Sequence, residues 1–367
     1  MITLGIMTLT MDSEQSYIND IARHAKECQM EVFRFSPSLI NPHTLMVNGR
    51  KYQPMDQSWV ECECPVPTII YDRCFYGDDD HSKQCMPIVS WLKSRQDITF
   101  LGYGLPNKLE LYHSLKDTLL SSYLPVSQAV SEPAIIIQKL SSHQRVILKP
   151  VNGSQGYGIY YLKRNDRSYQ VKTEKNKEII TRIFPNETKL LLWLNTLLKK
   201  HKYLLQPYLE LSNNELQPFD IRVLLQKDEK GDWVERGRGV RVGSTGGILS
   251  NLSAGGSVFP FNTWLKTIPT ITAEYIRQEL IYILTNLPSI LEQEFMPLFE
   301  IGIDIGVAKN GGLWILDMNS KPGRKVLLQT QPDVQEVLSR APLLYGKYLS
   351  QSEETERKIY YEKTLSH

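Results

Sequence analysis

The sequence has few cysteines, no long hydrophobic run and no surplus of charge of one sign. Its 367 residues carry 42 Lys plus Arg against 40 Asp plus Glu, so net charge gives no argument for a nucleic-acid partner. No apolar run reaches the roughly 18 residues of a membrane-spanning helix, and the first residues lack the basic region of a signal peptide. These absences favour a globular, cytoplasmic protein with no nucleic-acid or membrane partner.

The few cysteines all lie in the first quarter of the chain. They are Cys28, Cys62, Cys64, Cys74 and Cys85. An odd number without regular spacing argues against a disulfide framework. A zinc site at Cys62, Cys64 and Cys85 stays open, but no CxxC pair or histidine at zinc spacing accompanies them. We therefore favour free thiols in a reducing compartment.

The order of apolar segments predicts an α/β fold of several units. Strand–helix–strand alternation over residues 1–104 predicts an open α/β sheet. A second unit follows over 105–205, a third over 206–350 and a charged tail over 351–367. In the third unit we expect strands over 219–226, 233–242, 298–308 and 313–318, and a closing helix over 332–349.

A glycine-rich loop over 152–158 follows a strand that ends at Lys149, in the segment ILKPVNGSQGYGI. Glycines let backbone N–H groups approach phosphate oxygens, and a lysine adds a compact positive charge. The order of the glycines matches neither the P-loop nor the dinucleotide motif, and a strand rather than a helix follows. This segment alone leaves two interpretations open, a phosphate-binding loop and a glycine-rich hairpin with a surface lysine.

Three oxygen-bearing side chains lie on two neighbouring strands of the third unit. Asp317 and Asn319 are two residues apart and therefore point to one face, and a hairpin near Asn310 brings Asp304 beside them. Such a set of oxygen ligands suits Mg²⁺ shared with phosphate. The alternative is a solvated strand face, but the apolar flanking residues make an unpaired buried aspartate costly.

Arginines accumulate in FDIRVLL (219–225) and WVERGRGVRVG (233–243). Asp220 and Arg222 share a strand face. Arg238 and Arg241 are three apart and so point to opposite faces, which means that only one of them can enter a site. Arginines beside phosphate and Mg²⁺ would stabilise charge on a transferring phosphoryl group; cross-strand salt bridges are the alternative.

Together these segments resemble the ATP-grasp superfamily of ATP-dependent carboxylate–amine ligases, over about residues 106–345 and with the motifs in the family's order. The resemblance implies an α/β pre-ATP-grasp domain followed by a two-lobed ATP-grasp fold, with a small lobe over 105–205 and a large lobe over 206–350. Within the superfamily the chain is most similar to the YheC/YheD group, described as endospore-coat-associated, through IIYDR (69–73), QPFDIRVL (217–224) and LSNLSAGG (249–256).

The resemblance also implies roles for individual residues. The resemblance assigns ATP binding to Lys108, Lys149, Gly153, Ser154, Gln155, Gly156, Gly158, Gln206, Pro207, Tyr208, Leu209 and Asp220. It assigns the binding of two Mg²⁺ ions to Asp304, Asp317 and Asn319. It assigns catalysis to Arg222, Arg241 and Asn251. The chain departs from the family at Asp317, which is usually Glu, and at Ala254, which is basic in the glutamate-ligase branch.

Substrate contacts are expected at Asp72 and Arg73, because ligands favour the strand ends of open sheets, and at Gly255 and Gly256. A structural salt bridge is the alternative for the first two. The implied reaction is phosphorylation of a carboxylate by ATP, followed by attack of an amine on the acyl phosphate. The preferred substrates are a peptide or protein carboxylate, in a spore-coat context, and an amino acid. A small-molecule dipeptide or cell-wall ligase and a non-catalytic, ATP-binding coat component are the alternatives.

Overall fold

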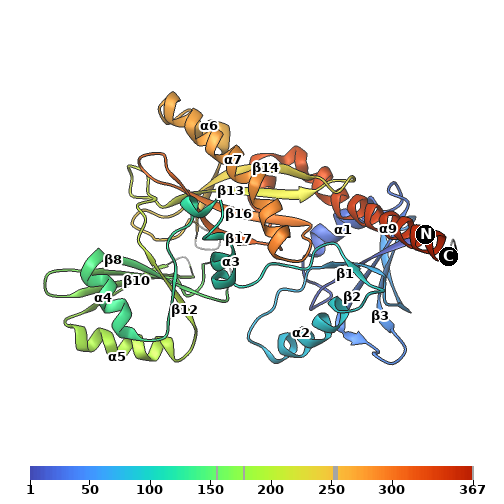
Figure 1. The fold of residues 1–367 in the computed structure, drawn as a ribbon, viewed down its shortest axis with the longest axis horizontal. Helices are drawn as coiled ribbons and strands as arrows, with labels where there is room; N and C mark the ends of the chain where they lie inside the picture. Colours follow the sequence, from blue (N-terminus) through green and yellow to red (C-terminus); the bar gives the residue numbers. More distant parts are fainter. Residues whose placement is uncertain (154–155, 177, 251–254, 366–367) are drawn as a thin grey trace.

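The computed structural model describes residues 1–153, 156–176, 178–250 and 255–365 and arranges them around three sheets (Figure 1). The first sheet belongs to the N-terminal domain, and the other two belong to the small and large lobes that follow it in the chain. Within these ranges, no helix has both the length and the apolarity needed to cross a membrane.

The N-terminal sheet has the order β4-β3-β2-β1-β5-β6. Its strands are β1 (Ile2–Met7), β2 (Met30–Ile40), β3 (Met46–Gln53), β4 (Ser58–Pro65), β5 (Ile69–Asp72) and β6 (Thr99–Phe100). Helices α1 (Gln15–Arg23) and α2 (Asp80–Lys93) connect the parallel strands. The open α/β sheet is confirmed. The antiparallel β3–β4 extension was not predicted, because β4 is an edge strand with mostly exposed side chains and little apolar pattern.

The small-lobe sheet has the order β11-β10-β9-β8-β12-β7. Its strands are β7 (Gln128–Val130), β8 (Arg145–Pro150), β9 (Tyr160–Arg164), β10 (Tyr169–Lys175), β11 (Glu178–Phe184) and β12 (Tyr203–Pro207). Helices α4 (Pro133–His143) and α5 (Glu187–Leu198) pack side by side against the sheet through Ile136, Leu140, Leu190 and Leu194. The opposite face of the sheet borders the cavity between the small and large lobes.

The large-lobe sheet has the order β15-β14-β13-β16-β17. Its strands are β13 (Phe219–Lys227), β14 (Trp233–Val242), β15 (Ser257–Pro260), β16 (Glu300–Val307) and β17 (Leu313–Asn319). The long helix α7 (Thr270–Glu294) shares a buried core with these strands through Ile276, Leu280, Ile283 and Leu287. Short helices α3 (Lys108–Leu115), α6 (Phe261–Leu265) and α8 (Lys325–Thr330) complete the lobe.

The last helix, α9 (Gln335–Leu365), returns to the N-terminal domain (Figure 1). Leu343 and Tyr345 join Leu4 and Ile69 in one core. The helix was expected to end near residue 349, yet its backbone continues to Leu365, consistent with the many good helix formers, Glu, Lys and Arg, in that stretch. The last helix therefore packs in the same domain as the first strand of the chain.

The five cysteines are free thiols. The Sγ atoms of Cys62 and Cys64 lie 3.5 Å apart on β4, while Cys28, Cys74 and Cys85 are buried. In the described part of the chain, no three His, Cys, Asp or Glu side chains are grouped as a metal site.

Candidate nucleotide-binding site

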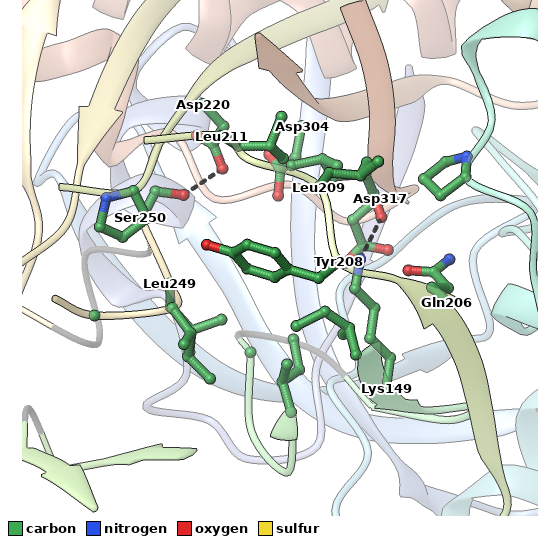
Figure 2. A pocket seen from close by; sticks show the side chains of 18 of the residues that line it. Lys149, Gln206, Tyr208, Leu209, Leu211, Asp220, Leu249, Ser250, Asp304 and Asp317 are labelled. Carbon is green, nitrogen blue, oxygen red and sulfur yellow. Dashed lines mark hydrogen bonds between the residues drawn. The ribbon is translucent and has the colours of Figure 1, made fainter. Parts of the chain in front are cut away.

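A cavity of about 1060 Å³, counted up to the solvent at its mouth, lies between the small and large lobes. Five segments form its walls: the end of β8 with the glycine-rich loop, the strand end Gln206–Leu209, the start of β13, the loop 247–250 and the strands β16 and β17. Figure 2 shows Lys149, Tyr208, Asp220, Asp304 and Asp317 gathered around it.

The register of the large-lobe sheet aligns polar residues of four strands. Asp304 on β16 lies directly opposite Asp317 on β17 and opposite Arg222 on β13. Asp220 lies opposite Arg241 on β14. Two neighbouring carboxylate–arginine rows thus lie side by side on the sheet, Asp317–Asp304–Arg222 and Asp220–Arg241, consistent with the predicted shared face of Asp220 and Arg222.

These groups are joined by short ion pairs. Arg241 donates to both oxygens of Asp220, at 2.7 and 2.5 Å, and its Nη2 lies 2.9 Å from Asp304 Oδ2. Arg222 Nε lies 2.6 Å from Asp304 Oδ1. Burial acts to raise the pKa of Asp304, but the two arginines outweigh it and hold the pKa below its usual value. The carboxylate is therefore ionised, as a metal ligand must be.

Arg238 lies on the other face of β14, as its odd spacing from Arg241 predicted. Its guanidinium pairs with Glu235 and lies over the ring of Phe261, 5.1 Å from the ring centroid. Arg241 instead pairs with Asp220 and Asp304, two residues that line the cavity, although neither Arg241 nor Arg222 lines it directly.

Two lysines approach the carboxylates, one from α3 of the large lobe and one from β8 of the small lobe. Lys108 is the first residue of α3, a helix capped by the Asn107 side chain, and its ammonium pairs with Asp317. Lys149 Nζ donates to the backbone oxygen of Leu316 at 3.4 Å. Burial lowers the pKa of Lys149 to about 8, against the opposing charge of Asp317. The two lysines both line the cavity, where phosphate oxygens would lie.

A bulge in β17 makes the Lys149 contact possible. Asp317 pairs with Asp304 while Ile315 pairs with Ile305, which leaves Leu316 without a partner in the ladder. The carbonyl of Leu316 is then free to turn toward Lys149. Strand alternation alone gives no signal for such an extra residue.

The strand end Gln206–Leu209 lines the cavity between the lobes. Gln206 is buried, and its amide donates to Ser127 Oγ at 2.7 Å. The ring of Tyr208 packs on Tyr161, with centroids 4.9 Å apart. These side-chain contacts hold the segment at the cavity wall, and it is one of the segments to which the resemblance assigned ATP binding.

The donor set fits Mg²⁺. Asp304 and Asp317 oppose each other and both line the cavity, and Asn319 follows on the same face of β17, where its Oδ1 accepts the Lys321 backbone N–H at 2.9 Å. Carboxylate and amide oxygens are the hard ligands that Mg²⁺ takes in proteins, with phosphate and water completing the shell.

Some expected residues lie elsewhere. Gly153 and Gly156 line the cavity, whereas Gly158 packs against Pro150, and its φ of 74° suits glycine. Gly255 and Gly256 do not line the cavity. Ser154, Gln155, Asn251 and Ala254 lie outside the described residues.

Asp72 and Arg73 lie in buried ion pairs, which matches the alternative of a structural salt bridge. Arg73 has a fully buried side chain and pairs with Glu14 at 2.6 Å and Glu300 at 2.8 Å. Asp72 is held by Lys93 at 3.0 Å and Lys321 at 2.7 Å. The strand ends that an open sheet would offer to a ligand are thus covered by the large lobe.

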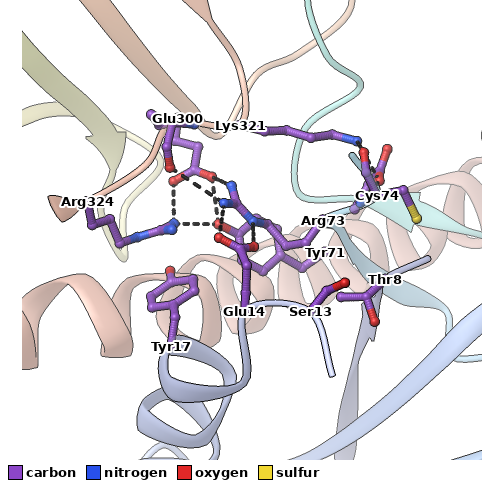
Figure 3. A network of polar contacts seen from close by, with 12 residues as sticks. Thr8, Ser13, Glu14, Tyr17, Tyr71, Arg73, Cys74, Glu300, Lys321 and Arg324 are labelled. Atoms are coloured by element: carbon purple, nitrogen blue, oxygen red, sulfur yellow. Dashed lines mark hydrogen bonds and ion pairs between the residues drawn. The ribbon is translucent and has the colours of Figure 1, made fainter. Parts of the chain in front are cut away.

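The sequence analysis missed the partners that cover these strand ends. Glu300 binds Arg324 at 2.8 Å and accepts from the Tyr71 hydroxyl at 2.6 Å, and the Arg324 guanidinium lies over the ring of Tyr17 (Figure 3). It also missed Glu174, whose carboxylate accepts backbone N–H groups of Ile248 and Leu249 at the cavity wall. No motif signals either contact, because the partners are far apart in the chain.

A protein-family model, described as YheC/D-like ATP-grasp, matches residues 97–349. The chain therefore belongs to this ATP-grasp family, and the paired lobes around the cavity are its ATP-grasp fold. The sequence is 38% identical to the "Endospore coat-associated protein YheC" of Bacillus subtilis (strain 168), over 98% of this chain and 99% of that protein.

Solved structures share the fold at low identity. A RiPP-associated ATP-grasp ligase from Chryseobacterium gregarium, in complex with ADP and a leader and core peptide, superposes with a TM-score of 0.55 and 14% identity, over 95% of this chain and 97% of the other. The D-alanine-D-alanine ligase from Coxiella burnetii superposes with a TM-score of 0.50 and 10% identity, over 98% and 100%.

Proposed function

We propose that the protein is an ATP-dependent carboxylate–amine ligase that forms an amide through an acyl phosphate. The observation that carries this proposal is the convergence of Asp304, Asp317, Lys108 and Lys149 around one cavity. A buried carboxylate such as Asp304 is costly for a scaffold, whereas phosphoryl transfer requires both a metal site and neutralising cations.

In this mechanism each group has a defined task. Lys108 and Lys149 neutralise the phosphates of ATP, and the glycine-rich loop offers backbone N–H groups to them. Asp304, Asp317 and Asn319 would hold Mg²⁺, which draws charge from the β- and γ-phosphates when bound. Arg241 and Arg222, held in place by Asp220 and Asp304, stabilise charge on the transferring phosphoryl group.

The carboxylate oxygen of the substrate attacks the γ-phosphorus, the bond to ADP breaks, and an acyl phosphate forms. An amine then attacks the acyl carbon, phosphate leaves, and the amine loses a proton. No side-chain nucleophile is needed, because the phosphate itself activates the carbonyl.

We propose a peptide or protein carboxylate as the acceptor and an amino acid as the amine. The peptide-bound RiPP-associated ligase with the same fold supports a peptide, and the name of the similar YheC protein supports a spore-coat protein in the cytoplasm of the coat-forming cell. The D-alanine-D-alanine ligase, with the same fold, keeps a small-molecule dipeptide as the competing substrate.

Hydroxylamine trapping tests the reaction. Purified protein is incubated with Mg-ATP, hydroxylamine and either a digest of spore-coat proteins or mixed free amino acids, and hydroxamate and ADP are measured. Hydroxamate above the level of Asp317→Ala supports a ligase, and the active mixture separates peptide from small-molecule substrates. Equal ADP release by wild type and Asp317→Ala in every mixture contradicts catalysis and leaves a nucleotide-binding coat component.

A further inference from the structure

A loop of the large lobe crosses the cavity and is held by a carboxylate of the small lobe. Glu174 on β10 accepts hydrogen bonds at its Oε1 from the backbone nitrogens of Ile248 and Leu249, the second at 2.9 Å. The Glu174 side chain is buried. Among the described residues, no Lys, Arg or His lies within ion-pair distance of it, so these N–H groups are what stabilises its charge.

The backbone comes this close only because residue 247 is glycine. A Cβ on Gly247 would lie 2.8 Å from Glu174 Oε1, nearer than side-chain carbons come to other atoms. Lys172, two residues before Glu174 on the same strand face, adds a second hold, since its ammonium donates to the Gly246 oxygen at 3.4 Å. The small lobe thus forms hydrogen bonds to the loop at three positions, Gly246, Ile248 and Leu249.

The other end of the loop is fastened to the large lobe. Ser250 Oγ donates to Asp220 Oδ2 at 2.5 Å (Figure 2), within the same carboxylate–arginine row that faces the cavity. Gly247, Ile248, Leu249 and Ser250 all line the cavity. Residues 246–250 therefore bridge the two lobes and form part of the wall around the nucleotide.

We propose that Glu174 is a positioning residue that clasps residues 246–250 across the cleft and so sets the rate at which nucleotide leaves. The proposal rests on the proposed function, since it needs a nucleotide in this cavity. Separation of the lobes must break the two charge-assisted hydrogen bonds of Glu174 before the wall can open. In the open form the carboxylate and the N–H groups regain water, so the clasp is reversible.

The test is the dissociation of a fluorescent nucleotide, N-methylanthraniloyl-ADP, from the full-length protein with Mg²⁺, measured by stopped flow after displacement with ATP. Glu174→Ala should release it about tenfold faster, because it loses two charge-assisted hydrogen bonds. Glu174→Gln keeps a carbonyl acceptor and should stay within about threefold of wild type. Glu178→Ala, an exposed carboxylate on neighbouring β11, should not change the rate.

The readout separates the clasp from a merely structural role. Partial misfolding of a variant changes the amplitude of the fluorescence signal but not the rate of the folded fraction. Equal rates for Glu174→Ala and Glu178→Ala overturn the clasp while leaving the ligase proposal intact. Failure of the wild-type protein to bind the nucleotide overturns both.

Discussion

The molecule contains two networks of carboxylates and cations built from the same residue types but exposed to water very differently. In the cleft, the side chains of Lys108 and Asp317 remain 21% and 35% exposed. Between the N-terminal domain and the large lobe, the side chains of Arg73 and Glu300 are 0% and 1% exposed (Figure 3). In the cleft network, the charged groups are accessible and can bind a ligand in place of each other. The network between the domains is closed to water and holds the two domains together.

The buried network between the domains, here called the sealed network, includes Arg73 with Glu300 and Asp72 with Lys321. It reaches the cleft through residues 319–321. Asn319 and Lys321 are two residues apart; the first belongs to the proposed metal set and the second pairs with Asp72 of the N-terminal domain. Leu105 N donates to Ser320 Oγ at 3.1 Å between them. The N-terminal domain and the metal-ligand strand therefore act as one body, and we expect the small lobe to be the part that moves.

Glu300→Ala should give the largest effect, because it leaves Arg73 and Arg324 buried without their shared carboxylate. We expect a loss of about 3–5 kcal/mol in the free energy of unfolding, measured by urea denaturation. The matched control is Glu274→Ala, whose ion pair with Arg277 is half-exposed and should contribute about 0–1 kcal/mol. Similar losses for the two variants would mean that the sealed network has no special role.

Asp317→Ala should show the opposite behaviour. We expect ATP-dependent turnover to fall by about 10²–10³-fold, the effect of removing one electrostatic group that stabilises a transition state. The thermal midpoint should change little, because the Asp317 side chain is 35% exposed. Loss of folding without a specific loss of turnover would place Asp317 among the structural residues instead.

Acid should lower the stability that the sealed network provides, because it protonates Asp72. Burial raises the pKa of this carboxylate, but Lys321 and Lys93 outweigh it and lower the pKa to about 2. The group therefore contributes stability that is full above its unfolded pKa of about 3.9 and is lost as pH falls through about 2. The difference in unfolding free energy between wild type and Asp72→Asn should be about 2 kcal/mol at pH 6 and shrink toward pH 2. A difference that does not change with pH would contradict this.

Arg238→Ala should give the smallest effect. Its side chain lies on the face of β14 away from the cavity and makes one ion pair and one cation–π contact. We expect unchanged turnover and a loss of about 0.5–1 kcal/mol in stability. Arg241→Ala, three residues further on, should instead abolish turnover, since it removes the cation shared by Asp220 and Asp304. Equal turnover in both variants would contradict the assignment of strand faces.

Much of the fold followed from local patterns. The hairpin around Asn310, the parity of Asp317 and Asn319, and the opposite faces of Arg238 and Arg241 depend only on the two-residue period of a strand, and the structure has each of them. The paired strands β3 and β4 escaped prediction because the mostly half-buried side chains of β3 and the mostly exposed side chains of the edge strand β4 carry little hydrophobic pattern.

Local patterns in the sequence were enough to predict the succession of strands and helices and the residue types suited to phosphate and metal chemistry, because spacing and glycine content are local properties. Tertiary structure alone decided that Arg73 is sealed against Glu300 rather than offered to a substrate, that Leu316 turns its carbonyl to Lys149, and that Glu174 grips a loop of the other lobe. Each of these contacts joins residues more than 70 positions apart, and their burial and register arise only when the sheets pack together.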